Sequence, residues 1–155
     1  MLRSGQGAQH DRAEKRVWNV VVFSVGGVKL AARSEEVGGV SPWTESVRVP
    51  SRTPYVQAML KREKDVLPIY DLGAQLNTVA QGDPLLCLVA RHVDGPMAIC
   101  IDAEVPSLQT VDAADIRSSV RQDLDTLGMF IENGEDIPIV ALHQLGRSER
   151  NSPGH

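Results

Sequence analysis

The chain has 155 residues, enough for one domain or for two very small subdomains that share a core. Hydrophobic residues make up 42% and charged residues 23%, as in globular proteins, but aromatic residues make up only 4%. We therefore expect a core of branched aliphatic side chains carried on strands. The net charge of −4 and the scattered lysines and arginines disfavour binding to nucleic acid or to an anionic membrane surface.

The two ends of the chain differ from its middle. Residues 1–16 and 147–155 are polar and rich in small or charged residues, which predicts disordered tails around a folded part at 17–146. The first 16 residues lack the apolar stretch of a secretory signal. The longest uninterrupted apolar run, Leu85–Ala90, is far shorter than the roughly 20 residues of a membrane-spanning helix. These features predict a cytoplasmic protein.

Turn-forming dipeptides separate the apolar runs of the folded part. Gly26–Gly27, Asp94–Gly95 and Asn133–Gly134 each stand between segments rich in β-branched residues. Such dipeptides adopt the positive φ angles that tight hairpin turns require. The sequence therefore predicts at least these antiparallel hairpins and an all-β fold.

Alternation within the runs predicts which strands are buried. Met97, Ile99 and Ile101 share one face of a strand, and the run Leu85–Ala90 is apolar on both faces, which favours small packed barrels over an open sheet. The spacing of apolar residues in 53–62 allows a short helix, and short helical turns are expected at 112–116 and 143–145. Pro68 predicts an edge strand or a bulged strand.

Motifs for catalysis and for metal binding are missing from the sequence. No GxSxG, GxxxxGK, HExxH or CxxC motif occurs, and the Gly5 and Gly7 pair lies in a tail. Cys87 and Cys100 lie in apolar runs, so we expect two buried thiols, with a disulfide or redox pair as the alternative. We expect no enzyme activity, no metal and no cofactor.

Polar residues at strand ends have structural explanations. Asp102 and Glu104 could form a general acid/base pair, but a polar strand end that faces water is the preferred interpretation. Asp71 alternates with inward residues and is expected to point inward and to cap backbone amides. His92 follows a strand, where a solvated histidine is expected.

The order of these segments resembles the CheW family of chemotaxis coupling proteins. Residues 53–76, TPYVQAMLKREKDVLPIYDLGAQL, are similar to its signature, whose Pro-Val/Ile-x-Asp-Leu ending is present at 68–72. Residues 20–40 resemble the family's first hairpin and its Val-x-Glu-Val strand. Residues 96–116 resemble its Val-Asp-x-Val segment, and 129–145 its last hairpin and terminal helix. The resemblance covers nearly all of 17–146.

The resemblance implies a fold and a function. The family fold is two small five-stranded β-barrels packed on each other. Its members are scaffolds without a cofactor. They link a histidine kinase of the CheA type to the cytoplasmic tip of a chemoreceptor.

The sequence departs from the family pattern near its partner contacts. Aligned on Pro68, the family's Asn-Leu-Arg-Gly reads Lys61–Lys64, with Glu63 in place of the arginine. Gly39 replaces the glutamate of Val-x-Glu-Val, and Ala58 the first glycine of the signature. These departures imply a re-specified partner surface.

We therefore expect partner contact through a small group of residues on this side of the barrel. They are Val37, Gly39, Ala58, Met59, Leu60 and Glu63. The alternative for Met59 and Leu60 is that both are core. Other functions left open are a CheW-like adaptor outside a chemoreceptor array, serving a pilus or another signalling enzyme, and a small-ligand-binding β-barrel.

Overall fold

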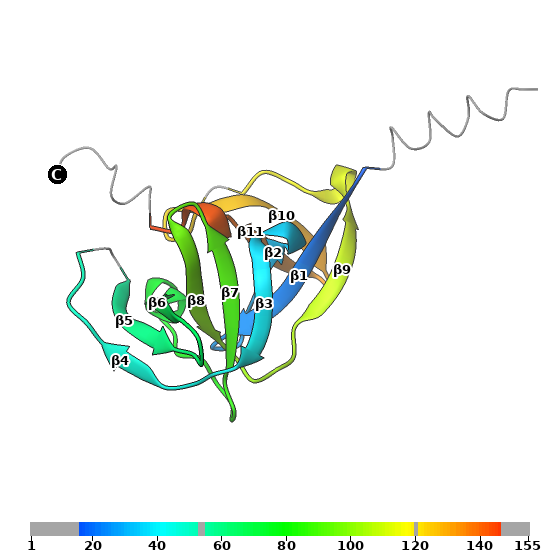
Figure 1. Ribbon diagram of the computed structural model, residues 1–155. Helices are drawn as coiled ribbons and strands as arrows, with labels where there is room; N and C mark the ends of the chain where they lie inside the picture. Colours follow the sequence, from blue (N-terminus) through cyan, green and yellow to red (C-terminus); the bar gives the residue numbers. More distant parts are fainter. Residues whose placement is uncertain (1–15, 53–54, 120, 147–155) are drawn as a thin grey trace, which may run out of the picture.

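Two curled sheets make up the protein (Figure 1), in a computed structural model that describes residues 16–52, 55–119 and 121–146. Five strands form sheet A, in the order β10 (Thr126–Glu132), β11 (Glu135–Val140), β2 (Val28–Arg33), β1 (Val17–Val25) and β9 (Ser107–Asp112). Six strands form sheet B, in the order β3 (Val37–Pro42), β7 (Leu86–His92), β8 (Gly95–Ile101), β6 (Val66–Tyr70), β5 (Val56–Lys61) and β4 (Ser46–Arg48). The all-β, two-barrel expectation is confirmed, with the three-residue β4 as a sixth strand of sheet B.

The chain runs through sheet A twice. It begins there with β1 and β2, builds all of sheet B between residues 37 and 101, and returns to sheet A with β9, β10 and β11. Each sheet contains one parallel contact, β11 against β2 and β6 against β8. Other pairings are antiparallel.

The three predicted hairpins are present. Gly26 and Gly27 turn β1 into β2 with φ angles of 62° and 82°, and Asn133 and Gly134 turn β10 into β11 with 52° and 80°. Positive φ at both central residues is the geometry that matches the twist of paired strands. In the β7–β8 hairpin His92 pairs with Gly95, so the turn lies one residue earlier than the sequence indicated.

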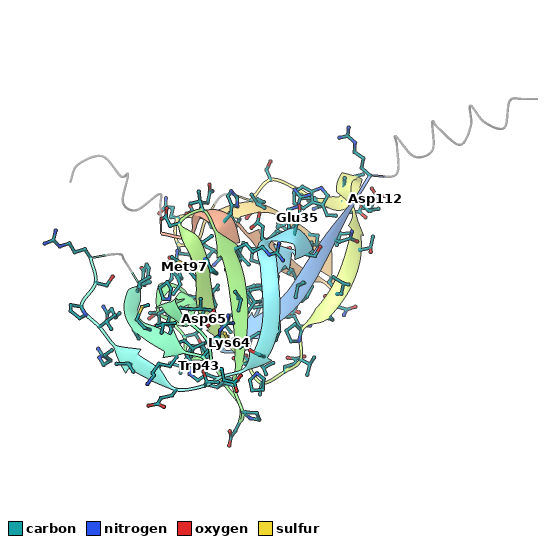
Figure 2. All side chains as sticks on the ribbon, in the orientation of Figure 1. Glu35, Trp43, Lys64, Asp65, Met97 and Asp112 are labelled. Carbon is teal, nitrogen blue, oxygen red and sulfur yellow. The ribbon has the colours of Figure 1, made fainter. Side chains whose placement is uncertain are left out.

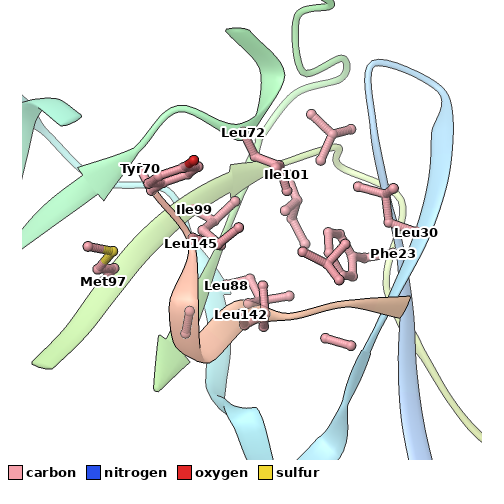
Figure 3. Close-up of a cluster of buried hydrophobic side chains, with 14 of the residues drawn as sticks. Phe23, Leu30, Tyr70, Leu72, Leu88, Met97, Ile99, Ile101, Leu142 and Leu145 are labelled. Carbon is pink, nitrogen blue, oxygen red and sulfur yellow. The ribbon is translucent and has the colours of Figure 1, made fainter. Parts of the chain in front are cut away.

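Buried side chains form three clusters. One lies inside sheet A around Val20, Ala31 and Phe130, and one lies inside sheet B around Leu60, Ile69 and Cys87. The largest cluster lies between the sheets, and ten of its residues are labelled in Figure 3: Phe23, Leu30, Tyr70, Leu72, Leu88, Met97, Ile99, Ile101, Leu142 and Leu145. The alternation predicted for β8 is confirmed, because its odd residues enter this central cluster and Ala98 enters the cluster of sheet B.

The prediction of a short helix at 53–62 is wrong. Residues 56–61 are strand β5, which pairs with β4 on one side and β6 on the other, and residues 53–54 lie outside the described residues. Pairing on two sides satisfies the backbone and overrides the weak helical spacing. Pro68 lies in β6, which is an interior strand, and the bulge in the partner strand β5 falls between Val56 and Ala58, not opposite Pro68. Its missing N–H is tolerated because β8 pairs only with Ile69 and Tyr70.

The expected short turns are confirmed. 3₁₀ turns span η2 (Ala113–Asp115) and η3 (Leu142–Gln144), and another, η1 (Ser34–Glu36), was not expected. The four-residue helix α2 (Leu72–Gln75) follows β6, and Asp71 caps it by accepting a hydrogen bond from the Ala74 N–H. The capping role is as expected, but Asp71 is exposed rather than inward.

Asp102 corrects the expectation of a water-facing strand end. Only 6% of it is exposed, and its carboxylate accepts hydrogen bonds from the backbone amides of Gly26, Gly27 and Gln81 at 2.7–2.8 Å. The Asp102 N–H donates to the carbonyl of Ser24. Because Asp102 follows β8 of sheet B and the glycines form the β1–β2 turn of sheet A, this residue joins the two sheets.

His92 is also buried, not solvated. Asp94 N–H donates to its Nδ1, which fixes Nδ1 as an acceptor, so Nε2 carries the proton and donates to the carbonyl of Leu145 at 2.8 Å. Nearby, the Val93 N–H donates to the His143 carbonyl, and the Glu36 carboxylate accepts from the His143 backbone N–H. These contacts hold the C-terminal turn η3 against β7 and η1.

Candidate functional site

An apolar row crosses the outer face of sheet B. Val47, Met59 and Pro68 are direct cross-strand partners on β4, β5 and β6, and they point away from the inner cluster that contains Leu60 and Ile69. Val47 is 44% exposed, and Met59 and Pro68 are half-buried. Val66, 52% exposed, lies two residues before Pro68 on the same face. We call these four residues the outer row.

The outer row has the character of a contact surface. It is continuous over three strands, and its members are aliphatic or thioether side chains that gain little from contact with water. Lys61, the pairing partner of Val66, places a charged side chain at its border. An apolar centre with a polar rim is the usual build of a protein interface.

The candidate residues on β5 divide between the two faces. Met59 belongs to the outer row, whereas Ala58 packs against the inner cluster of sheet B. Leu60 has no exposed surface and is a core member of that cluster. Its expected role in partner contact is therefore wrong, because strand alternation turns it inward. Its alternative assignment to the core is correct.

The candidates on β3 lie at the far edge of the same sheet. Val37 packs against the central cluster and Gly39 is exposed, and three strands separate β3 from β5 in the sheet order. Gly39 has a φ of 153°, beside a bulge in the β3–β7 pairing. An L side chain such as the family's glutamate would be strained there. The structure thus does not bring Val37 and Gly39 into the outer row.

Glu63 lies in the exposed turn between β5 and β6. Its neighbours Arg62 and Asp65 form a bidentate pair, with both nitrogen–oxygen distances at 2.8 Å. These hydrogen bonds lower the pKa of Asp65 and raise that of Arg62, so the pair stays ionised. Because Arg62 is engaged in this way, it does not replace the arginine that Glu63 displaces. Lys64 and Asp65 lie toward the same end of the molecule as Trp43, opposite Glu35 and Asp112 (Figure 2).

The reactive side chains singled out from the sequence are Asp102, Cys87 and Cys100. The Asp102 carboxylate is occupied by its three amide donors and does not serve as a general acid or base. Cys87 and Cys100 face each other across β7 and β8 as free thiols, the first buried and the second half-buried. Burial, then the neighbouring Cys87, raises the pKa of Cys100 to about 11. Among the described residues, no three His, Cys, Asp or Glu side chains are grouped as metal ligands would be.

The fold and the surface together define a class of protein. It is an all-β module whose conspicuous surface feature is the apolar outer row on sheet B. Across the described residues, no helix has the length and apolar character needed to cross a membrane.

Comparison with known proteins assigns this module to a family. Residues 19–150 match the family described as CheW-like domain, so the chain belongs to that family. Among solved structures it is similar to the scaffolding protein TtCheW from Thermoanaerobacter tengcongensis, with a TM-score of 0.69 and 15% sequence identity. The match covers 83% of this chain and 91% of that one, and at this identity it shows the fold. No curated protein matches the sequence.

Sequence reasoning missed part of the outer row. Val47, Val66 and Pro68 were not among the candidates, because their exposure depends on which face each strand turns outward. The alternation in Ser46–Arg48 and Val66–Tyr70 carries that information, but only pairing with β5 shows that the apolar residues meet.

Proposed function

We propose that this protein is a non-catalytic coupling module that links a histidine kinase of the CheA type to the cytoplasmic tip of a chemoreceptor. Membership of the CheW-like domain family supports the scaffolding role. The outer row is the single structural observation that carries the proposal, since it offers an exposed apolar surface on rigid strands. Because both proposed partners act in the cytoplasm, the proposal includes a cytoplasmic location for this protein.

The outer row and the Glu63 turn have separate roles in this proposal. The row supplies the apolar centre of a contact, which determines how long a partner stays bound. The turn supplies charge at its rim, which discriminates between partners. Val37 and Gly39, on the opposite edge of sheet B, would serve a second contact, as a protein with two partners requires.

The direct test is binding by the whole chain. Isothermal titration against the CheW-like regulatory domain of a chemotaxis kinase from the same organism, and separately against a receptor-tip fragment from that organism, should give saturable binding. Met59→Asp should keep the wild-type melting temperature and weaken kinase binding by about tenfold or more. Val105→Asp is the matched control, because Val105 is 79% exposed and lies outside the outer row.

The other outcomes are informative. Binding that survives Met59→Asp in a folded protein would remove the outer row from the contact. If the chain instead binds neither fragment, while a pull-down from its own cells returns a different signalling enzyme or a pilus component, the chain is an adaptor outside chemoreceptor arrays.

A further inference from the structure

The inner face of sheet B has a floor of small apolar side chains. Ala58, Ile69, Cys87 and Ala98 form or border the inner cluster, and Cys100 lies directly opposite Cys87 in the strand register. Four of these five residues are alanine or free cysteine on interior strands. Such side chains leave room above a sheet that larger aliphatic residues would fill.

The two edge strands do not fill this space either. On β3, Gly39 and Ser41 pair with Val89 and Cys87 and share their face. On β4, Ser46 and Arg48 pair with Leu60 and Ala58 and share theirs. These four edge residues are all exposed, and β3 and β4 are not hydrogen-bonded to each other. The second barrel is therefore open along one side.

A cavity of about 600 Å³ results. Its apolar lining includes Trp43, Ala58, Ile69 and Cys100, and its polar lining includes Arg48 and Asp71. Small-molecule sites usually have volumes of about 300–1,000 Å³, apolar walls and a few polar groups. Burial raises the pKa of Cys100 to about 11, so this thiol is neutral near pH 7 and adds to the apolar floor.

The charged side chains that line the cavity, Arg48 and Asp71, indicate the charge of the ligand that it would bind. Arg48 reaches the cavity from β4, and no ion pair or hydrogen bond of its side chain occurs within the described part of the chain. A guanidinium in this state is a fork-shaped donor for a planar anion. Asp71 lines the same cavity and disfavours a second negative charge. The combination fits a monoanion with an apolar body better than a phosphate dianion.

We propose that this cavity binds a small amphipathic carboxylic acid, with its apolar chain or ring on the Ala58–Cys100 floor against Trp43 and its carboxylate on Arg48. This site is distinct from the outer row, because Ala58 and Arg48 face inward whereas Met59 and Val47 face outward. The inference does not depend on the coupling function.

Decanoate and 1-naphthoate are suitable probes, one a chain and the other a ring. Trp43 fluorescence reports binding in a Trp18→Phe background, since the chain has two tryptophans, and calorimetry on the wild-type chain checks the stoichiometry. We expect saturable one-to-one binding of at least one probe. Decanol, which lacks the charge, should bind more weakly.

Two variants test whether the ligand binds in this cavity. Arg48→Gln should weaken binding by about tenfold, as expected for a lost charged hydrogen bond, and Ala58→Leu should fill the floor and remove binding. Arg117→Gln, an exposed arginine near β10 of sheet A, is the control and should bind like the wild type. The inference is overturned if neither probe binds saturably, or if a folded Arg48→Gln protein binds as tightly as the wild type.

Discussion

Asp102 Oδ2 lies 2.8 Å from the backbone nitrogen of Gly27, so a residue just past the end of sheet B closes the tight turn of sheet A. The other carboxylate oxygen accepts from Gly26 and Gln81. A single side chain thereby satisfies three backbone donors from two segments that lie 54 residues apart (81 − 27). We therefore expect a substitution of Asp102 to weaken the connection between the two sheets strongly.

Asp102→Asn should destabilise the protein although it conserves shape. An amide nitrogen would face a backbone N–H that now meets a carboxylate oxygen, and hydrogen bonds to charged groups contribute about 1.5–3 kcal/mol each. We expect the free energy of unfolding from urea titration to fall by about 2 kcal/mol or more. Glu104→Gln, at an exposed residue two positions along, should stay within about 0.5 kcal/mol. Equal stability of both variants would show that this connection is held by packing alone.

Leu60→Asp and Met59→Asp should behave differently although the residues are neighbours. Leu60 is fully buried in the inner cluster, so a charge there should cost several kcal/mol and unfold the chain. Met59 lies in the outer row, where the same change is tolerated. Thermal melting followed by circular dichroism separates them. A cooperative melt of Leu60→Asp near the wild-type temperature would contradict the assignment of faces.

Glu63→Arg tests whether the partner surface has been re-specified. The exposed Glu63 carboxylate would repel any partner carboxylate placed to pair with an arginine at this position, and Arg62 is already engaged by Asp65. We therefore expect weak binding of a conventional chemotaxis kinase or receptor tip, and binding about tenfold tighter or more after Glu63→Arg. The natural partner should carry a basic residue opposite Glu63 and lose affinity for this variant.

The control for this charge repair is Glu104→Arg, which adds the same charge at an exposed residue of another segment. If the wild type already binds as tightly as a conventional coupling protein and Glu63→Arg changes nothing, Glu63 is merely solvated. In that case its effect is screened by salt, as for most exposed charges.

Cys100 should make stability depend on alkaline pH. Its pKa of about 11 in the folded protein exceeds the ordinary value of 9.0, because burial penalises the thiolate. The folded state therefore binds more protons between these values. The contribution of Cys100 is fully present below about pH 9 and is lost as the pH rises through about 11. Cys100→Ala should show a smaller fall in urea midpoint over this window, and identical profiles would exclude the effect.

His92→Leu should loosen the C-terminal turn without unfolding the sheets. The imidazole bonds the Leu145 carbonyl and the Asp94 N–H, and leucine offers neither contact. Hydrogen exchange should accelerate at the Asp94 amide and at the Val93 amide, which donates to His143. Amides in the interior of β8 should keep their wild-type rates, and unchanged exchange at Asp94 would argue against the tether.

Local chemistry made part of this structure predictable. The glycine-containing turns could be predicted because few residues adopt the positive φ angles that a tight hairpin requires. The alternation of residues in β8 correctly predicted which of its faces is buried. Strand β5 could not be predicted from its sequence, because its apolar spacing also fits a short helix. Only its pairing with β4 and β6 shows that the segment is a strand. Asp102 and His92 looked solvent-exposed because their hydrogen-bond partners come from distant segments.

The return of the chain to sheet A has a consequence for its synthesis. All strand partners of sheet B lie between residues 37 and 101, so that sheet has its full complement of strands as soon as this stretch leaves the ribosome. Strand β2 must wait for its parallel neighbour β11, whose Ile139 pairs with Ala31. Because contacts between distant residues form slowly, the nascent chain exposes one side of the β1–β2 hairpin until translation is nearly complete. A chain that stops before residue 135 therefore lacks the strand that covers β2 and should be captured by chaperones or proteases.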